Sequence, residues 1–249
     1  MPAAETVARL RPTATVGRTT LSRARFDAAV FDLDGVITDT AALHEAAWAH
    51  MFDESLPDRP AFTAEDYRAF VDGKAREDGV TGYLSARGIT VEPARVRDLA
   101  ERKDRYFRQL LAESGPGVIA SSVDLVHRLR AAGLAVAVAT ASRNGAQVLE
   151  RAGLADLFDL RVDGVVADRL HLPGKPDPAL FLEAARRLDT PPHRIVLVED
   201  SRAGVTAARR GGFGLVVGLD RAGRGGLWAA GADVVVADLA TLSVTTGTP

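Results

Sequence analysis

The sequence predicts an α/β protein with a Rossmann-like, doubly wound parallel sheet as its core and a small helical domain inserted after the first strand. Short segments rich in Val, Leu and Ala are apolar almost without interruption, as strands covered on both faces are. Amphipathic segments alternate with them, which is typical of helices packed on a sheet. Residues 41–113 interrupt this alternation, because they show helical patterns and no strand pattern.

The core is expected to comprise residues 26–40 and 114–249. Its first strand ends at the sequence FDLDG, and later strands are predicted over 134–141, 194–200, 214–219 and 232–238. Helices are predicted over 122–133, 145–153, 177–188 and 202–212. Because the strands are parallel, their carboxyl ends meet at one edge of the sheet, where ligands bind in folds of this class.

The inserted segment, residues 41–113, is expected to form a helical cap domain. Residues 1–25 are rich in Arg, Thr and Ala, and we expect a disordered N-terminal extension there, with a transit peptide as the alternative. The last residues, 241–249, are expected to fray.

The composition limits the classes of function. The chain has 249 residues, of which 47% are hydrophobic and 26% are charged, as in a globular protein of one large domain or of a core with an insert. The net charge of −2 predicts no nucleic acid and no membrane surface as a partner. There are no cysteines, which excludes disulfides, thiolate metal sites and a Cys nucleophile, and fits the cytoplasm. A monomer is expected.

Polar side chains follow several of the predicted strands. The first strand delivers Asp32 and Asp34, and Gly35 lets the chain turn away after them. Spacing by two residues points both carboxylates the same way along an extended chain. Like charges in one place repel, so this pair predicts either a bound cation or an exposed surface loop.

The other strand ends add to this set. Thr140 and Ser142 follow one strand, Glu199 and Asp200 end another, and Lys175 lies in the loop between them. Crowded carboxylates with no His or Cys cluster favour Mg²⁺, which commonly shares its ligands with a phosphate. A lysine and a hydroxyl beside the metal can hold the remaining phosphate oxygens. The pattern therefore predicts phosphoryl transfer, in which one aspartate is the nucleophile and the other moves protons.

The motifs FDLDGVITDT, TAS, GKPDP and VEDS occur in this order and resemble those of the haloacid dehalogenase-type phosphotransferase superfamily, over about residues 26–238. Within that span, FDLDGVITDTAALHEAAW and TASRNG resemble the β-phosphoglucomutase family. Such enzymes interconvert β-glucose 1-phosphate and glucose 6-phosphate. They use an aspartyl-phosphate enzyme and a glucose 1,6-bisphosphate intermediate.

The resemblance implies roles for the core residues. Asp32 would be the nucleophile and a Mg²⁺ ligand, and Asp34 the general acid and base with its backbone carbonyl on the metal. Asp200 and Glu199 would complete the Mg²⁺ site. Thr140 and Lys175 would hold the transferring phosphate. The sugar phosphate and its surroundings would be held by Ala141, Ser142, Arg143 and Asn144.

The resemblance also implies roles in the insert. Thr40 would lie at its hinge, and His44 and Trp48 would lie near the sugar and the acid/base. Arg76, in the loop GKARED, would grip the non-transferring phosphate, with Lys103 beside it. Five of the predicted residues also have a purely structural interpretation. Trp48 and His44 could be core residues, and Arg76, Lys103 and Arg143 could be solvated charges.

One position departs from the family pattern. The mutases carry a lysine directly before the glycine of the insert loop, where this chain has Asp72, with Lys74 after the glycine. Lys74 could replace the missing amine. Otherwise Asp72 would place a negative charge where an anionic substrate should bind.

The sequence therefore leaves the reaction open between two enzymes. The first is a phosphosugar mutase with Mg²⁺ and glucose 1,6-bisphosphate as cofactors. The second is a sugar-phosphate phosphatase that uses water as the acceptor. A non-enzymatic binding domain and a dehalogenase are less favoured, because all four motifs are intact and the second aspartate suits phosphoryl transfer.

Overall fold

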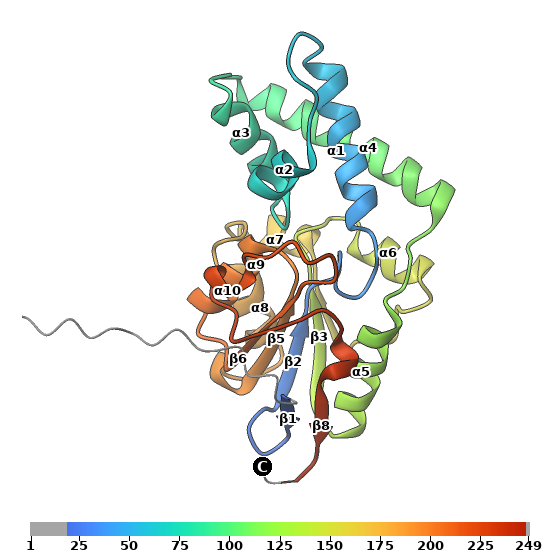
Figure 1. The fold of residues 1–249 in the computed structure, drawn as a ribbon, viewed down its shortest axis with the longest axis vertical. Coiled ribbons are helices and arrows are strands. Elements are labelled where there is room, and N and C mark those ends of the chain that lie inside the picture. Colours follow the sequence, from blue (N-terminus) through green and yellow to red (C-terminus); the bar gives the residue numbers. More distant parts are fainter. Residues whose placement is uncertain (1–18, 248–249) are drawn as a thin grey trace, which may run out of the picture.

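A computed structural model describes residues 19–247 (Figure 1). The core contains a six-stranded sheet in which every neighbouring pair of strands is parallel, in the order β4-β3-β2-β5-β6-β7. The strands are β2 (Ala28–Phe31), β3 (Ala135–Ala139), β4 (Leu160–Val162), β5 (Ile195–Glu199), β6 (Leu215–Leu219) and β7 (Val234–Val236). The predicted class is confirmed.

Alternate residues of each central strand pack into different cores, which explains why the strand segments are continuously apolar. Phe31 of β2 shares its core with Leu125 and Leu129 of the helix α5, and the preceding Val30 shares the opposite core with Phe181 of α8. The core helices are α5 (Ala120–Ala131), α6 (Gly145–Arg151), α7 (Gly164–Arg169), α8 (Ala179–Arg187), α9 (Arg202–Arg210) and α10 (Leu227–Ala230). Two short 3₁₀ turns are η2 (Pro192–Arg194) and η3 (Leu239–Thr241).

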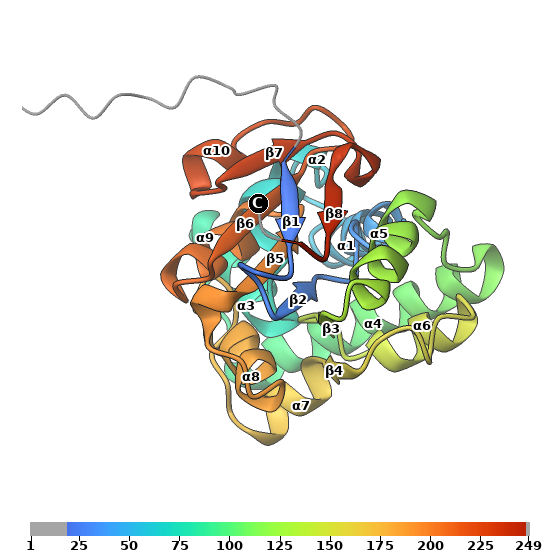
Figure 2. The same ribbon diagram turned by 90° about the horizontal axis from the view of Figure 1, so that it is seen from below.

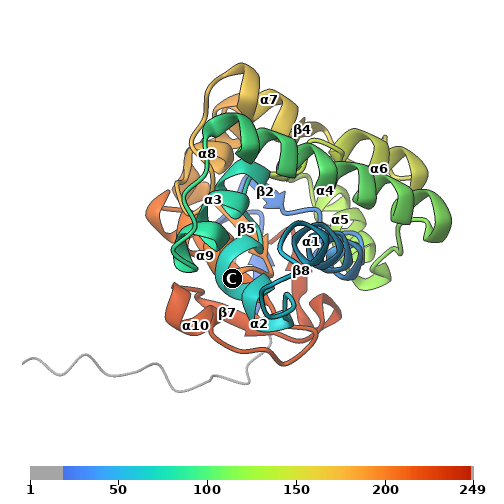
Figure 3. The same cartoon turned by 90° about the horizontal axis from the view of Figure 1, so that it is seen from above.

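Residues 41–114 form a separate bundle, here called the helical unit, which stands over the carboxyl ends of the strands (Figures 1 and 3). It consists of α1 (Ala41–Ser55), α2 (Ala64–Asp66), the π-helical turn η1 (Tyr67–Val71), α3 (Arg76–Ala86) and α4 (Pro93–Ser114). The unit has its own apolar core, built around stacked and tilted rings of Phe52, Phe62 and Tyr83. It can therefore move as a body relative to the sheet.

The predictions for the chain ends need correction. Thr20–Ser22 form the strand β1, which pairs in parallel with β8, Ser243–Thr245, at the end of the core away from the helical unit (Figure 2). Leu21 is fully buried in the main core, so burial of this side chain fixes a segment that was expected to be disordered. The same pairing orders residues expected to fray. Residues 1–18 lie outside the described part of the chain.

Several other short elements were not predicted. They are the edge strand β4, the helices α7 and α10, and the 3₁₀ turns η2 and η3, none longer than two turns. Within residues 19–247, no helix combines the length and the apolar composition needed to cross a membrane.

Candidate active site

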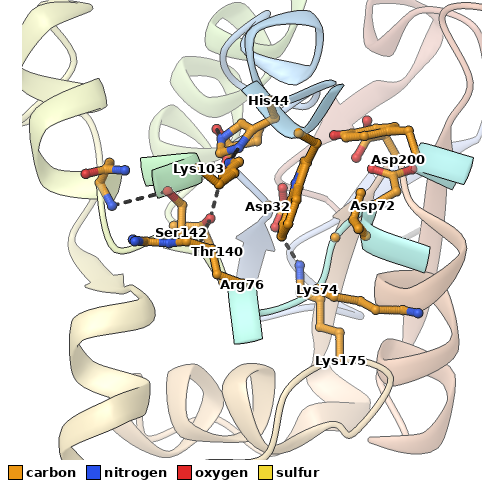
Figure 4. Close-up of a pocket in the computed structure, with 17 residues that line it drawn as sticks. Asp32, His44, Asp72, Lys74, Arg76, Lys103, Thr140, Ser142, Lys175 and Asp200 are labelled. Atoms are coloured by element: carbon orange, nitrogen blue, oxygen red, sulfur yellow. Dashed lines mark hydrogen bonds and ion pairs between the residues drawn. The ribbon is translucent and has the colours of Figure 1, made fainter. Parts of the chain in front are cut away.

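A cavity lies between the helical unit and the carboxyl ends of β2, β3 and β5 (Figure 4). It is where the sheet edge predicts a ligand site. Most of the predicted site residues line it: Asp32, Asp34, His44, Trp48, Lys74, Arg76, Lys103, Thr140, Ala141, Ser142, Asn144, Lys175 and Asp200. Thr40, Arg143 and Glu199 do not.

Lys175 forms the buried centre of one end of the cavity. Its ammonium group donates to Oδ1 of Asp32 at 2.6 Å and to Oε1 of Glu199 at 2.7 Å, and all three side chains are buried. Burial raises the pKa of Asp32 to about 8, although the positive charge of Lys175 acts to lower it. Burial opposes the charge on Lys175 too, but Asp32 and Glu199 raise its pKa above the ordinary lysine value. The lysine therefore stays cationic at neutral pH.

Asp34 lies two residues further on and has different partners. Its carboxylate accepts hydrogen bonds from Thr40 at 2.6 Å and Thr140 at 3.1 Å, and Nε2 of His44 lies 3.2 Å away. Burial acts to raise the pKa of Asp34, but His44 and the two threonines outweigh it and hold that pKa below the ordinary value. Asp34 is therefore ionised and ready to accept a proton. The two aspartates of one strand end thus have separate environments.

His44 connects Asp34 to the helical unit. Its Nδ1 lies 2.6 Å from the ammonium nitrogen of Lys103, and its ring stacks on Phe107 with centroids 4.0 Å apart. Burial and the charge of Lys103 lower the pKa of His44. If Nδ1 accepts from Lys103, the neutral tautomer carries its proton on Nε2 and donates to Asp34. This tautomer satisfies both contacts.

The end of the cavity beside β5 suits a hard cation. Asp200 lines it, and burial together with the carboxylates of Glu199 and Asp72 raises its pKa well above the ordinary value. A Cβ atom on Gly35 would lie 2.0 Å from Oδ2 of Asp200, so only glycine allows this close approach. Carboxylates crowded in this way fit Mg²⁺, which is commonly held by one or two carboxylates and a substrate phosphate.

The donor set is smaller than the sequence predicts. No three His, Asp or Glu side chains within residues 19–247 are arranged to hold a metal ion by themselves. Glu199 lies beneath the cavity, where Lys175 occupies its Oε1 and the backbone N–H of Ser201 donates to its Oε2 at 2.6 Å. Asp32 and Asp200 are the carboxylates of the predicted metal set that line the cavity at this end, and Glu199 as a metal ligand stays a prediction.

The opposite end of the cavity carries donors for an anion. Arg76 begins α3 in the helical unit, and Ser142 and Asn144 come from the core loop after β3. In Figure 4 Arg76 and Ser142 lie on the side of Asp32 away from Asp200. The cavity thus has a carboxylate and lysine end and a separate arginine end.

Besides Glu199, two of the predicted residues lie outside the cavity wall. Thr40 is fully buried at the start of α1 and acts on the site through Asp34, and its hinge role stays a prediction. Arg143 points to the outside, where it pairs with Asp168 and, at 3.0 Å, with Glu77 of α3. Arg143 therefore contacts the helical unit rather than the cavity.

The position of Asp72 differs from the expectation. It lies beside Asp200, not beside Arg76, so its charge faces the predicted metal end (Figure 4). Burial and the charge of Glu199 raise its pKa to about 6. Lys74 lines the cavity but extends to the opposite side from Arg76 in Figure 4. The departure in the loop therefore bears on the metal end.

The site includes several further residues that the sequence motifs do not predict. Tyr67, Val71 and Gly73 also line the cavity. A Cβ atom on Gly73 would lie 2.2 Å from Oγ of Ser201, so this glycine marks a close approach of the helical unit to the core. The loop motif around Asp72 was a signal for Gly73. The apolar spacing of Tyr67 and Val71 looks the same as that of ordinary core residues.

The fold and this site define a class of protein. The chain belongs to the haloacid dehalogenase-like hydrolase family, whose sequence profile ("Hydrolase: haloacid dehalogenase-like hydrolase") matches residues 26–212. It is an enzyme family, and the resemblance inferred from the motifs is confirmed.

Particular relatives narrow this class. The chain is 42% identical to a β-phosphoglucomutase of Mycobacterium bovis, over 86% of this chain and 90% of that protein. It is 32% identical to a phosphorylated carbohydrates phosphatase of Thermotoga maritima, over 78% of this chain and 85% of that protein. A crystal structure of β-phosphoglucomutase from Clostridium difficile superposes with a TM-score of 0.75 at 25% identity, covering 88% of this chain and 93% of that one.

Proposed function

We propose that this protein is a Mg²⁺-dependent phosphosugar mutase of the β-phosphoglucomutase type. It interconverts β-D-glucose 1-phosphate and D-glucose 6-phosphate through an aspartyl-phosphate and β-glucose 1,6-bisphosphate. The observation that carries the proposal is a cavity with anion-binding groups at both ends, Lys175 at one and Arg76 at the other. A bisphosphate intermediate needs both ends, whereas hydrolysis of a monoester needs one. The similarity to a mycobacterial β-phosphoglucomutase supports the same substrate.

In the proposed reaction, Asp32 is the nucleophile. One of its carboxylate oxygens attacks the phosphorus of the bisphosphate, an O–P bond to Asp32 forms, and the bond to the sugar oxygen breaks. Lys175 already lies 2.6 Å from Asp32 and neutralises charge on the transferring group. Asp200 and Asp32, with the backbone carbonyl of Asp34, would hold Mg²⁺, which supplies further charge stabilisation to the phosphoryl oxygens when bound.

Asp34 moves the proton in each half of this proposed cycle. It takes the proton of the sugar hydroxyl that attacks the aspartyl-phosphate. In the other half, when the phosphoryl group moves from the bisphosphate to Asp32, it gives a proton to the sugar oxygen that leaves the phosphorus. The Asp34 carboxylate is ionised before the sugar binds, so it is free to take up the proton of the attacking hydroxyl. His44, Thr40 and Thr140 hold the group in place through their contacts with it.

The fate of the aspartyl-phosphate separates this function from the second candidate. A phosphatase relative supports hydrolysis, in which water takes the place of the sugar hydroxyl. Asp32 and Lys175 are buried beneath the helical unit, which keeps water away from the bond while the unit covers the core. This burial favours the mutase.

The experiment supplies the protein with β-glucose 1-phosphate, Mg²⁺ and a trace of glucose 1,6-bisphosphate, and measures glucose 6-phosphate and free phosphate together. The mutase predicts glucose 6-phosphate in large excess over free phosphate. Mostly free phosphate would establish the phosphatase instead, and the absence of both products would exclude this substrate. The Asp32→Asn variant is the control, which should lose turnover and keep the circular dichroism spectrum of the wild type.

A further inference from the structure

Asp104 on α4 is a carboxylate that neither the motifs nor the proposed chemistry uses. Its Oδ1 accepts a hydrogen bond from Nδ2 of Asn144 at 2.8 Å and lies 3.2 Å from Nη1 of Arg76. The side chains of Asp104 and Arg76 are only 15% and 12% exposed. The contact is therefore sheltered from solvent, where charge pairs are stronger than at the surface.

Asp104 has one further partner, Arg108 on α4 itself, whose half-exposed Nε lies 3.0 Å from Oδ2. The two partners that bind Oδ1 come from different parts of the molecule. Arg76 belongs to the helical unit, and Asn144 belongs to the core loop after β3. Both line the cavity, whereas Asp104 lies behind them and does not. The Asp104 carboxylate thus binds one donor from each side of the boundary between the helical unit and the core. It can bind both donors only while the helical unit covers the core.

The surroundings of this carboxylate explain why its charge matters. Lys103 precedes it on α4, and burial together with the charge of Arg76 lowers the pKa of Lys103 to about 7. Burial lowers the pKa of Arg76 as well, and Asp104 opposes that effect. Two buried cations side by side repel each other. Asp104 is the carboxylate in contact with Arg76, so it keeps that guanidinium at its place in the wall.

We propose that Asp104 is a positioning residue that assembles the distal-phosphate site when the helical unit closes. Closure brings Asn144 onto the carboxylate that already holds Arg76, so that both donors face a phosphate group at the arginine end of the cavity. The ligand concerned is a sugar phosphate whose phosphate lies away from Asp32. The choice of that ligand rests on the proposed mutase function, and the coupling of Asp104 to closure does not.

A second contact across the same boundary provides a matched control. Nη2 of Arg143, the residue before Asn144, lies 3.0 Å from Oε1 of Glu77 on α3. Both side chains are about one-third exposed, at 35% and 34%, and Arg143 also pairs with Asp168 in the core. An exposed pair with an alternative partner contributes little. The Glu77→Gln variant therefore removes a charge from the same boundary at a residue that does not line the cavity.

The experiment compares Asp104→Asn, Asp104→Ala and Glu77→Gln with the wild type. For Asp104→Ala we expect the KM for β-glucose 1-phosphate to rise about tenfold or more, since the contacts to Arg76 and Asn144 in the cavity wall are lost. The KM for p-nitrophenyl phosphate, which has no distal phosphate, should change less than about twofold. Asp104→Asn keeps the size and one acceptor oxygen and should give an intermediate rise. Glu77→Gln should match the wild type for both substrates.

A measurement on the substrate-free protein tests the coupling separately. Amide hydrogen exchange in residues 141–147 should be faster in Asp104→Ala than in the wild type and in Glu77→Gln, because the core loop loses its anchor. Unchanged exchange there, or an equal rise in KM for both substrates, would overturn the proposal. If the wild type does not turn over the sugar phosphate but exchange responds as expected, the coupling stands and the proposed function fails.

Discussion

The ammonium nitrogen of Lys103 lies 2.6 Å from Nδ1 of His44, in a side chain that is only 2% exposed. Trp48 and Phe107 flank the ammonium group at 5.2 and 4.9 Å from their ring centres. Burial of an amine among rings and other cations opposes its protonation. The buried ammonium group therefore lowers the stability of the substrate-free protein.

Replacement of Lys103 by Met should stabilise the substrate-free protein while it reduces turnover of the sugar phosphate. Burial lowers the pKa of Lys103 to about 7 in the folded protein, so the unfolded chain binds more protons between about pH 7 and 10.5. The contribution of Lys103 to the free energy of unfolding of the wild type therefore increases as the pH rises from about 7 to about 10.5. At pH 7 we expect Lys103→Met to gain about 2 kcal/mol in the free energy of unfolding.

Urea unfolding at pH 6.5 and at pH 9.5 measures this effect. The advantage of Lys103→Met over the wild type should shrink at the higher pH, because the wild-type amine is then neutral in the folded state. A constant difference between the two pH values would show that the gain comes from the added apolar surface and not from the removed charge.

Lys175→Met should have the opposite effect on stability. Removal of the ammonium group leaves Asp32 and Glu199 buried side by side without a cation. Breaking a buried pair in this way costs about 3–5 kcal/mol. Urea unfolding without Mg²⁺ should show a loss of this size. The double variant Lys175→Met/Glu199→Gln should recover part of the stability and no turnover, and a Lys175→Met protein as stable as the wild type would contradict this account.

Gly73→Ala should prevent the helical unit from reaching the core. Gly73 has φ of +70°, and its new Cβ would lie 2.2 Å from Oγ of Ser201, which caps α9 through the N–H of Gly204. Gly88→Ala is the matched control, because Gly88 has φ of +69° and a Cβ added there would meet nothing within 4 Å. Both variants carry the same backbone strain, about 1 kcal/mol.

Turnover of β-glucose 1-phosphate distinguishes the two glycine variants. Gly73→Ala should lose about 100-fold in kcat/KM, as expected when catalytic groups are displaced by about 1 Å. Gly88→Ala should keep nearly the full wild-type kcat/KM, and only its free energy of unfolding should decrease. Equal activities in the two variants would mean that Gly73 does not approach Ser201 in the working enzyme.

Arg76→Ala tests the arginine end of the cavity directly. The side chain lines the cavity opposite the Asp32 and Lys175 end. A lost hydrogen bond to a charged group costs about 1.5–3 kcal/mol, so kcat/KM for β-glucose 1-phosphate should fall about 10- to 100-fold. Turnover of p-nitrophenyl phosphate should change far less. Equal losses with both substrates would place Arg76 outside substrate recognition.

The sheet and its site could be predicted because the signals are local. Buried strands such as Ala28–Phe31 and Ile195–Glu199 are continuously apolar up to their ends, and the polar residues that follow them must lie at the same edge of a parallel sheet. The edge strand Leu160–Val162 escaped prediction because it is short and pairs with only one neighbour in the described sheet. Thr20–Ser22 escaped because their partner lies more than two hundred residues away in the sequence.

The details of the site depend on contacts between parts of the chain that are distant in sequence. The sequence shows that Asp72 belongs to the loop of the insert. It does not show whether Asp72 faces Asp200 or Arg76, since that depends on how the helical unit sits on the core. Asp104 is one of several charges along α4, and nothing in its spacing distinguishes it from a solvated residue. Its partner Asn144 is 40 residues further along the chain.

The pairing of β1 with β8 brings Thr20 and Ser243 together at the base of the core. That base lies at the end of the strands opposite the helical unit (Figures 1 and 2). A protein domain joined before Thr20 or after Thr245 would leave from this base, clear of the moving part of the molecule. The fold is thus suited to tandem fusion, and a fluorescent or affinity module attached at either point should leave substrate entry unobstructed.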